Sequence, residues 1–434
     1  MAHLLYNTAL AILENLICLA HSKTVSGIFR RIFSPKTIQF IESHPTDHIQ
    51  KISHLLANET RDIYWVHAAS LGEYAVARPL LKELRQSGNK CVVLTFFSPT
   101  GYYALKGKPA SVTDADYILT LPIDTRHNAK AFVDALSPRS VIFIISEYWA
   151  NYLHELSSRK IPVTLVSAII SERSVFFKWY GAMHRRTLRC FTSFTVLDKK
   201  SHDNLVKLGI SRTHAIVTGD PLFDNAISTA KTTYHDQIIE SFCGKGAKTF
   251  VAGSISDKKD LGMVSYIANK HRDTRFIIVP HEISEETLND IKYHLEGHAM
   301  LYSECTHTTD FSQVQVLIID FIGSLSRIYR YGQWAYVGGG FTPFLHSVIE
   351  PVVYGIPVAF GPRIHRKVTP RQMADIGIGC MVRSRQELDD WFSQLKHNEP
   401  MLADIRQKAT DYAGRNAGAT RQVISVITNQ DIPF

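Results

Sequence analysis

Short apolar runs rich in valine and isoleucine alternate with amphipathic stretches from residue 60 onward, and this alternation constrains the fold more than any other feature. Residues 63–67 predict a strand, and residues 73–86 predict a helix with Val76, Leu80 and Leu84 on one face. Repeated βα units of this kind form parallel sheets covered by helices on both faces. Further strands are predicted at residues 91–95, 117–121, 141–145, 163–167 and 194–197.

The alternation stops near Gly219 and Pro221 and then restarts, which predicts a second α/β domain. Its strands are predicted at residues 249–252, 276–279, 316–319, 334–337 and 358–360, and terminal helices at 401–412 and 419–427. We therefore expect two tandem Rossmann-like, doubly wound domains that face each other across a cleft. The expected segments are an amino-terminal segment 1–50, domains 51–225 and 226–412, and a final segment 413–434 that packs back on the first domain.

The amino-terminal residues 4–20 are largely apolar but contain Asn7 and Glu14, which makes a membrane-spanning helix unfavourable. On a helical wheel these two residues share one side, whereas Leu5, Ile12, Leu16 and Leu19 lie towards another. Together with the basic residues that follow (Lys23, Arg30, Arg31 and Lys36), this pattern predicts a helix that lies in the membrane interface. The alternative is a soluble helix packed on its own domain.

The net charge of +8 agrees with an anionic partner, such as a membrane surface or a nucleotide. The charge is not concentrated in one basic run, and no nucleic-acid recognition module is present, so nucleic-acid binding fits worst. The six cysteines are scattered without a C-x-x-C pair, which argues against a disulfide framework or a cysteine zinc site.

In doubly wound sheets ligands bind beyond the carboxyl ends of the strands, so the loops after strands are the candidate sites. The first such loop, residues 67–73, has the sequence HAASLGE and places Glu73 at the start of a helix. Glu73 is either a general base or a charge that stabilises the helix terminus. Glu147 follows the strand at 141–145 and either meets a ligand or caps a helix, with Trp149 in the core.

Two more loops complete the candidate set. Residues 171–174 have the sequence SERS, in which Ser171 could cap a following helix. In the second domain, residues 338–340 are three consecutive glycines, and they lead to His346, Ser347 and Glu350. Glycines let backbone N–H groups approach a ligand, and the next helix N-terminus suits an anion.

These motifs, in this order, resemble the 3-deoxy-D-manno-octulosonic acid (Kdo) transferases, inverting enzymes of the two-domain GT-B architecture. The HAASLGE motif is intact at 67–73 and SERS is intact at 171–174. Trp149 and Asn151 match a family Trp-Pro-Asn in which Ala150 replaces proline. Residues 336–362 match the family's glycine loop, donor-site helix and following strand, so the resemblance covers nearly the whole chain.

The resemblance implies transfer of Kdo from CMP-Kdo to lipid IVA, the lipid A precursor, at the cytoplasmic face of the inner membrane. It implies that Glu73 is the general base and that Glu147 supports the transition state, with no cofactor and no bound metal. It assigns the CMP of the donor to Pro280, His281, Ile322, Gly323, Ser324, Ser347, Val348, Ile349 and Glu350. The acceptor side of the cleft would use Ser70, Gly72, Glu172 and Arg173.

The sequence departs from the family pattern at two cationic positions. Leu222 stands where the family commonly has a basic residue, and His281 stands at the position of a family arginine. A lost charge-assisted hydrogen bond to phosphate costs about 1.5–3 kcal/mol unless another group replaces it. Replacement cations are available just past Gly361 and Pro362, at Arg363, His365, Arg366 and Lys367.

Two other functions remain open. One is a related transferase or epimerase with a UDP-sugar donor, which shares the architecture. The other is a catalytically silent relative that binds lipid or nucleotide, for which the altered cationic positions argue. The retention of both Glu73 and Glu147 argues against the silent relative.

Overall fold

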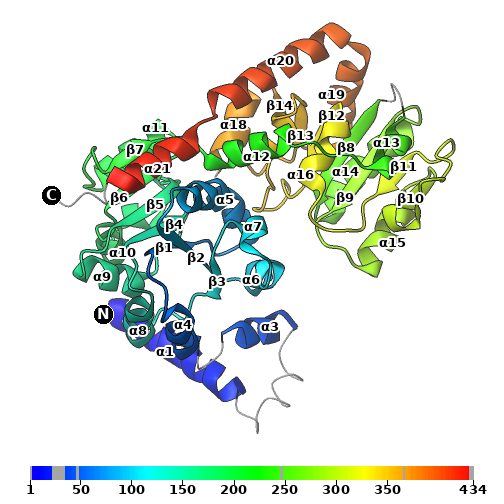
Figure 1. Cartoon of the computed structure of the whole chain (residues 1–434). Coiled ribbons are helices and arrows are strands. Elements are labelled where there is room, and N and C mark those ends of the chain that lie inside the picture. The colour runs from blue at the N-terminus through cyan, green and yellow to red at the C-terminus, as the bar shows by residue number, and fades with distance from the viewer. Residues whose placement is uncertain (1, 22–34, 45–47, 245–247, 365–366, 430–434) are drawn as a thin grey trace. The chain divides into compact units, whose positions relative to one another are not determined.

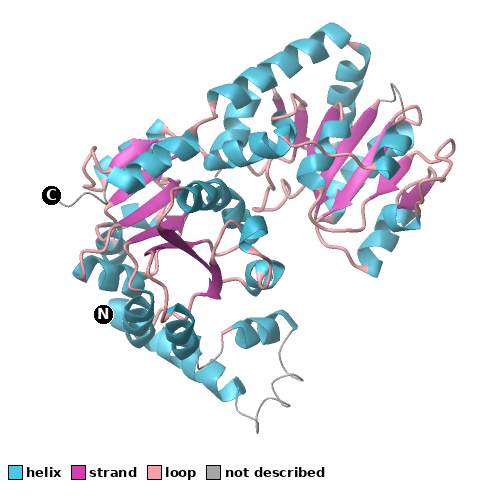
Figure 2. Ribbon diagram, in the orientation of Figure 1, coloured by secondary structure: helices cyan, strands magenta, loops and turns pink. Residues whose placement is uncertain are grey.

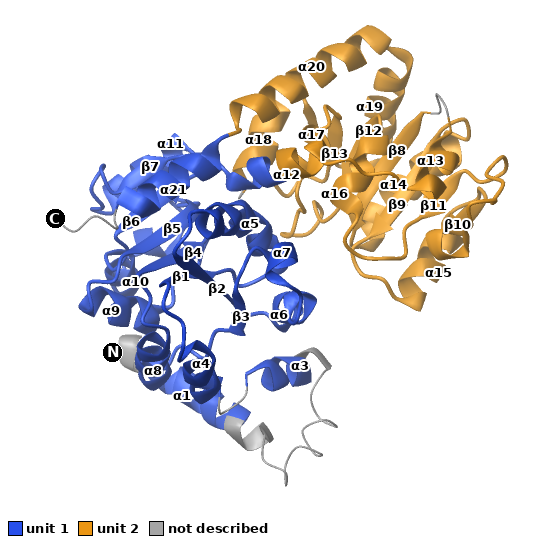
Figure 3. Cartoon of the chain, in the orientation of Figure 1, with its two compact units in different colours: residues 1–225, 418–434 blue, residues 226–417 orange. Residues whose placement is uncertain are grey.

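The computed structural model describes residues 2–21, 35–44, 48–244, 248–364 and 367–429. The chain divides into two compact units (Figure 3). Unit 1 comprises Met1–Asn225 and Gly418–Phe434, and unit 2 comprises Ala226–Ala417. Each unit contains one seven-stranded sheet whose strand pairs are all parallel, with helices packed on it (Figures 1 and 2).

The sheet of unit 1 has the strand order β3-β2-β1-β4-β5-β6-β7. Its strands are β1 (Asp62–His67), β2 (Lys90–Phe96), β3 (Tyr117–Thr120), β4 (Ser140–Ile144), β5 (Val163–Ala168), β6 (Ser193–Val196) and β7 (Ala215–Val217). Its helices are α1 (Ala2–His21), α3 (Pro35–Ser43), α4 (His48–Leu56), α5 (Leu71–Gln86), α6 (Pro99–Leu105), α7 (Ala110–Thr113), α8 (Arg126–Leu136), α9 (Ala150–Ser158), the 3-10 turn η1 (Val175–Phe177), α10 (Ala182–Leu188), α11 (Lys199–Lys207) and α21 (Ala419–Asn429).

The sheet of unit 2 has the strand order β10-β11-β9-β8-β12-β13-β14. Its strands are β8 (Thr249–Ile255), β9 (Arg275–Pro280), β10 (Ala299–Leu301), β11 (Val316–Ile318), β12 (Trp334–Val337), β13 (Val358–Phe360) and β14 (Gly379–Met381). Its helices are α13 (Gln237–Cys243), α14 (Lys258–Lys270), α15 (Glu285–Tyr293), η2 (Tyr302–Glu304), α16 (Leu325–Ile328), η3 (Tyr329–Tyr331), α17 (Ile349–Val352), α18 (Val368–Asp375), α19 (Arg385–His397) and α20 (Glu399–Arg415), and α12 (Pro221–Lys231) runs across the division between the units.

The predicted fold class is confirmed, and the differences lie at the sheet edges. The sequence did not predict β7, β10 and β14, each of which is an edge strand of its sheet. An edge strand needs only three residues to pair with its single neighbour, and β10 and β14 are only partly buried. Short, partly exposed strands lack the continuous apolar pattern by which the central strands are predicted.

Each sheet has one topological switch point, where the strand order reverses. In unit 1 it lies between β1 and β4, and in unit 2 between β8 and β12. Neighbouring loops leave the sheet in opposite directions at such a point, which creates a ligand-binding crevice at the carboxyl ends of the strands. The topology therefore directs the search for a site to the loops after these strands.

Helix α21 returns to unit 1 and completes its core. Its Val423 and Ile427 are fully buried in the same apolar cluster as Leu80 and Leu84 of α5. The carboxylate of Asp224 accepts hydrogen bonds from the backbone N–H groups of Gly418 (2.7 Å) and Thr420 (2.7 Å). Asp224 therefore satisfies backbone donors at the start of α21 that would otherwise lack partners.

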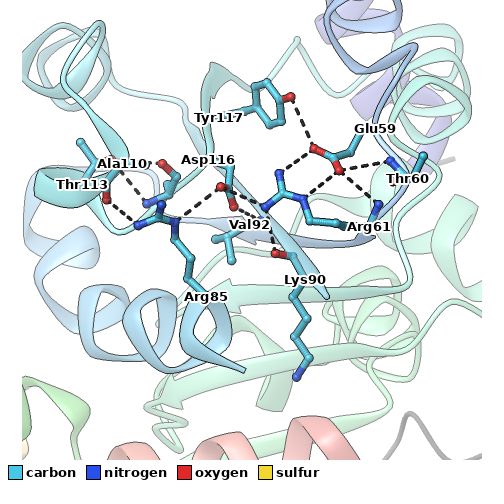
Figure 4. A network of polar contacts seen from close by, with 11 residues as sticks. Glu59, Thr60, Arg61, Arg85, Lys90, Val92, Ala110, Thr113, Asp116 and Tyr117 are labelled. Carbon is cyan, nitrogen blue, oxygen red and sulfur yellow. Dashed lines mark hydrogen bonds and ion pairs between the residues drawn. The ribbon is translucent and has the colours of Figure 1, made fainter. Parts of the chain in front are cut away.

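An ion network around Arg61 and Asp116 lies at the amino ends of β1, β2 and β3 (Figure 4). Arg61 donates to Glu59 (Nη2 to Oε2, 2.7 Å) and to Asp116 (Nη1 to Oδ1, 3.2 Å). The second oxygen of Asp116 accepts the backbone N–H of Val92 at 2.9 Å. Hydrogen bonds from Arg61 lower the pKa of Glu59 from 4.5 to about 2.

We expect Asp116→Ala to lower the free energy of unfolding by about 2 kcal/mol, because it leaves the buried Val92 N–H without its acceptor and removes one of the two carboxylates that Arg61 binds. Urea denaturation measures this loss. Asp134→Ala is the matched control, because it removes ion pairs of a carboxylate that is 47% exposed and should cost less than about 1 kcal/mol. Equal losses for the two variants would contradict the role of the network.

The network also predicts acid sensitivity. Because the folded-state pKa of Glu59 lies below its unfolded value of 4.5, its stabilisation is present above pH 4.5 and is lost as the pH falls towards about 2. The free energy of unfolding should therefore fall less steeply between pH 4.5 and 2 in Glu59→Gln than in the wild type.

Candidate active site

The loops at the unit 1 switch point bring Glu73 and Glu147 into electrostatic contact. Burial, and after it the charge of Glu147, together raise the pKa of Glu73 from 4.5 to about 7. Hydrogen bonds from the Ser70 and Ala69 backbone oppose this shift without cancelling it. A carboxyl group with a pKa near neutrality can accept a proton at physiological pH, as a general base must.

Glu73 also closes a capping box at the start of α5. Its Oε2 accepts the backbone N–H of Ser70 at 3.0 Å, while the Ser70 hydroxyl accepts the backbone N–H of Glu73 at 3.4 Å. The helix-stabilising interpretation of Glu73 is therefore correct, and it holds the carboxylate in place. A position in the capping box does not prevent proton transfer, since the second oxygen, Oε1, remains outside these bonds.

Glu147 is buried against His67 and Trp149. The indole N–H of Trp149 donates to Glu147 Oε2, and His67 Nε2 lies 3.3 Å from the same oxygen in a geometry that does not make a hydrogen bond. The other ring nitrogen of His67 lies 2.8 Å from the Thr95 hydroxyl, which accepts from Trp65 Nε1. The indole N–H of Trp65 can only donate, so the hydrogen of the Thr95 hydroxyl is available for donation to Nδ1 of His67. A histidine that accepts at Nδ1 carries its ring proton on Nε2, the nitrogen on the side of Glu147.

Glu147 does not cap α9, which was the structural alternative to a ligand-binding role. The first backbone N–H groups of that helix, those of Asn151 and Tyr152, donate instead to Asp124 at 3.1 and 2.9 Å. The carboxylate of Glu147 is thus held at the carboxyl end of β4 by aromatic side chains rather than used for helix capping.

The backbone before Glu147 is strained. Ile145 was predicted to lie in the strand, but β4 ends at Ile144 and Ile145 has a φ of 65°. A β-branched residue rarely adopts a positive φ, and such conformations concentrate at functional sites. Ser167 also has a positive φ, of 57°, and lies within β5 where the pairing with β6 shifts register, so the strain recurs near the carboxyl end of the next strand.

The acceptor candidates separate into two groups. Ser70 and Gly72 lie in the first turn of α5 beside Glu73. Glu172 is exposed and pairs with Lys207 on α11 at 2.7 Å, and Arg173 is exposed. Ser171 does not cap a helix, because its hydroxyl accepts the Arg173 N–H within a turn at 3.2 Å and the next turn, η1, begins four residues later.

In unit 2 the glycine loop packs against the protein's own backbone. A Cβ on Gly338 would lie 2.1 Å from the Ser254 oxygen, and one on Gly340 would lie 2.5 Å from the Gly361 nitrogen. The N–H of Gly338 donates to Gly253 at 3.0 Å and that of Gly339 donates to Asp260 at 2.7 Å. These two N–H groups are therefore not available to a ligand, contrary to the interpretation from the sequence.

Asp260 on α14 is the residue that fixes this loop, and the sequence did not identify it. Its fully buried carboxylate accepts the Gly339 N–H and the hydroxyl groups of Tyr336 (2.8 Å) and Ser256 (3.1 Å). The sequence signal was weak, because an aspartate in the first turn of a helix is normally explained by capping.

Two serine hydroxyls at the predicted donor site are buried without a hydrogen-bond partner among the residues that the structure describes. They belong to Ser324, after β11, and to Ser347, after the glycine loop. Buried hydroxyl groups without partners are uncommon in folded proteins and indicate a ligand or water. Ile322 is 84% exposed, and Gly323 has a φ of 102°, so this loop presents its backbone and an apolar side chain to solvent.

His281 and His346 stack with ring centroids 4.3 Å apart. Burial, and after it the charges of His281 and Lys367, together lower the pKa of His346 from 6.5 to about 4. His346 is therefore neutral at pH 7 and cannot supply a cation. Pro280 ends β9 directly before His281, so both donor candidates lie at the carboxyl edge of the sheet.

Two of the four replacement cations are placed near this loop. The backbone N–H of Arg363 donates to the Gly340 carbonyl at 2.8 Å, and the charge of Lys367 acts on His346. His365 and Arg366 lie outside the described residues. Helix α17 (Ile349–Val352) is a single turn, so its dipole adds little to an anion site. Burial raises the pKa of Glu350, on this turn, to about 7.

The described residues contain no group of three or more histidine, cysteine, aspartate or glutamate side chains that could hold a metal ion. None of the described helices is both long and apolar enough to cross a membrane.

Known proteins resemble this chain in sequence and in fold. Residues 44–225 match the family model of the 3-deoxy-D-manno-octulosonic-acid transferase (kdotransferase) amino-terminal domain. The chain is 25% identical to the 3-deoxy-D-manno-octulosonic acid transferase of Chlamydophila psittaci (strain ATCC VR-125 / 6BC), over 81% of each chain. It is 27% identical to the enzyme of that name from Aquifex aeolicus (strain VF5), over 75% of this chain and 83% of the relative.

Solved structures support the fold. The UDP-GlcNAc 2-epimerase from Neisseria meningitidis aligns with a TM-score of 0.62 at 15% identity, covering 85% of this chain and 100% of the epimerase. MurG of Acinetobacter baumannii aligns with a TM-score of 0.54 at 14% identity, covering 85% and 99%. At these identities the likeness concerns the GT-B fold alone. The sequence matches over most of the chain show that this protein is similar to the Kdo transferases, and the family model covers residues 44–225.

Proposed function

We propose that this protein transfers Kdo from CMP-Kdo to lipid IVA with inversion at the anomeric carbon. Its similarity to the Kdo transferases supports the sugar, and the pairing of Glu73 with Glu147 supports the chemistry. The observation that carries the proposal is that two carboxylates, Glu73 at the start of α5 and the buried Glu147 after β4, lie at the switch point of unit 1.

In the proposed reaction Glu73 removes the proton from an acceptor hydroxyl group. The oxygen attacks the anomeric carbon of Kdo, the bond from that carbon to the CMP phosphate oxygen breaks, and CMP leaves with the bonding electrons. Glu147 supports the positive charge that develops on the sugar, since a carboxylate in a buried position stabilises nearby positive charge strongly. The proposed mechanism uses no metal ion, as the family resemblance implies.

For the donor we propose the loops at the carboxyl edge of the unit 2 sheet. Ser324 and Ser347 have buried hydroxyl groups that would donate to or accept from CMP, and Glu350 would accept from the ribose. Lys367 and Arg363 would supply the positive charge for the phosphate that the family obtains from the two replaced positions. Pro280, His281, Ile322, Gly323, Val348 and Ile349 complete the proposed site.

The amino-terminal helix supports a location at the cytoplasmic face of the inner membrane. Its polar side chains face unit 1: Tyr6 donates to Asp124 at 2.6 Å, and Glu14 accepts from Asn128 at 2.6 Å. Several of its apolar side chains face outward, with Leu5 65% and Ile12 57% exposed, whereas Ile17 is buried. This arrangement is the reverse of an ordinary soluble helix, and an apolar outer face suits the bilayer interface. The basic residues Lys23, Arg30 and Arg31 lie outside the described residues.

The outward face of α1 predicts membrane binding that mutation can separate from folding. We expect the triple change Leu5→Ser, Ile12→Ser, Leu16→Ser to weaken sedimentation with phospholipid vesicles by about tenfold or more, because it removes apolar area from the bilayer contact. Circular dichroism should be unchanged, since these side chains are exposed. Wild-type vesicle binding in the triple variant would contradict the membrane role of α1.

The proposed function is tested by a transfer assay with CMP-Kdo and tetraacylated lipid A precursor in detergent. Product from the wild type establishes the reaction. If the folded protein gives no product, titration with CMP and with UDP distinguishes a UDP-sugar enzyme, which binds UDP more tightly, from a silent relative. The UDP-sugar enzyme is the second candidate function, and only the fold shared with the UDP-GlcNAc 2-epimerases favours it.

A further inference from the structure

An aromatic turn on unit 1 is exposed to an unusual degree. Trp179 is 90% exposed and Tyr180 is 57% exposed, directly after η1 (Val175–Phe177). Their rings contact each other edge to face, with centroids 5.5 Å apart. A tryptophan normally buries most of its large apolar surface, so exposure of two adjacent aromatic rings marks a contact surface.

The turn is rigid rather than loose. Arg185 donates from one guanidinium nitrogen to the carbonyl groups of Phe176 (2.8 Å) and Lys178 (2.9 Å), and Gly181 N–H donates to Lys178 at 2.9 Å. A Cβ on Gly181 would lie 2.0 Å from the Val175 oxygen, so this tight turn requires glycine. The backbone that carries the two aromatic residues is therefore fixed by hydrogen bonds on both sides of them.

The surroundings of the turn are cationic. Residues 172–189 contain five basic residues (Arg173, Lys178, Arg185, Arg186 and Arg189) and a single acidic residue, Glu172, which pairs with Lys207. Lys178, Arg186 and Arg189 are exposed. Aromatic side chains with a polar edge beside exposed cations are typical of segments that rest at the head-group level of an anionic bilayer.

The turn belongs to the same part of unit 1 as the candidate site. Phe176 packs edge to face on Tyr148, with centroids 5.1 Å apart, and Tyr148 is the neighbour of Glu147. Helix α10 contacts α9, the helix to which α1 is joined through Asn151 and Asn7 at 2.8 Å. Two outward apolar surfaces, on α1 and on the Trp179 turn, are thus attached to the elements that carry Glu147.

We propose that the Trp179–Tyr180 turn, with Lys178, Arg186 and Arg189, is a second membrane contact that binds an anionic phospholipid surface. The proposal rests on the proposed function for its location at a membrane, but it assigns that contact to residues outside α1. Two separated contacts fix the orientation of unit 1 on the bilayer, which a single helix cannot do.

Vesicle binding of the full-length protein tests the proposal. Vesicles of phosphatidylethanolamine and phosphatidylglycerol are compared with phosphatidylcholine vesicles for the wild type and Trp179→Ala. We expect Trp179→Ala to weaken binding to the phosphatidylglycerol vesicles by about tenfold, as expected for loss of one interfacial aromatic ring. Tyr293→Ala is the matched control, because Tyr293 is 85% exposed on unit 2 and lies outside the turn. Its binding should equal that of the wild type.

Two further measurements make the test decisive. Brominated lipids should quench tryptophan fluorescence in the wild type more than in Trp179→Phe, and Arg186→Gln/Arg189→Gln should weaken binding only to the anionic vesicles. Wild-type binding by Trp179→Ala overturns the proposal, as does equal wild-type binding to phosphatidylcholine. The transfer assay in detergent tests the proposed function separately, because it contains no vesicles. If the wild type shows no transfer activity, the proposed function is refuted, and the vesicle-binding results can still be interpreted.

Discussion

Glu73→Gln is expected to lower kcat for Kdo transfer by about 10²–10⁴-fold, the usual contribution of a general base. Glutamine keeps the size of the side chain, and its carbonyl oxygen can still accept the Ser70 N–H in the capping box. The proton acceptor is removed and the helix start is kept. The assay uses CMP-Kdo and lipid A precursor in detergent, with product measured at saturating concentrations of both substrates.

The pH profile separates this role from a structural one. With a pKa of about 7, the wild-type kcat/KM should fall as the pH drops below 7, and the residual rate of Glu73→Gln should lack that limb. Because the folded pKa of Glu73 lies above its unfolded value of 4.5, its charge disfavours the folded state above pH 4.5. Glu73→Gln should therefore be at least as stable as the wild type at pH 8. An active variant, or one that loses activity only by unfolding, would contradict the assignment of the base.

Asp260→Asn is expected to raise the KM for CMP-Kdo by about 10–100-fold, equivalent to one or two lost hydrogen bonds to a charged group. The Asp260 carboxylate accepts from three donors, on Gly339, Tyr336 and Ser256. An asparagine side chain keeps only one accepting oxygen and removes the negative charge to which all three groups donate. The glycine loop would then lose its fixed position beside Ser347.

Asp236→Asn is the matched control for a merely structural effect. Asp236 also accepts several hydrogen bonds in unit 2, including those from the N–H groups of Ile238 and Ile239, and it caps α13. None of its hydrogen bonds within the described residues reaches the glycine loop. The control should leave the KM for CMP-Kdo unchanged. If Asp260→Asn changes thermal stability but neither KM nor the affinity for CMP, the positioning role of Asp260 is wrong.

The central strands of both sheets could be predicted from sequence because parallel strands are buried on both faces and are apolar throughout. The strands β1, β2 and β4 show this pattern, with almost every residue buried. The edge strands β7, β10 and β14 could not, because each has one strand neighbour and is partly exposed. Where burial is incomplete, the sequence loses its periodic signal.

Some residues of the candidate site could likewise be predicted from the sequence, and others could not. Glu73 and Glu147 were identified from their positions after strands, and those positions follow from local sequence. His67, Asp124 and Asp260 were not, because each acts through partners far along the chain: Asp260 holds Gly339, 79 residues away. A single residue in a helix start or at a strand end carries no local sign of such a contact.

The sequence by itself determined the two parallel α/β sheets, their strand-end loops and the pair of carboxylates, because apolar periodicity and loop chemistry are local properties of the chain. Only the tertiary structure decided what surrounds those groups. It buried Glu73 near Glu147 and so raised its pKa, it occupied two glycine N–H groups internally, and it turned the polar face of α1 towards unit 1. Burial and electrostatic contact depend on which distant segments meet, and that information exists only once the chain has folded.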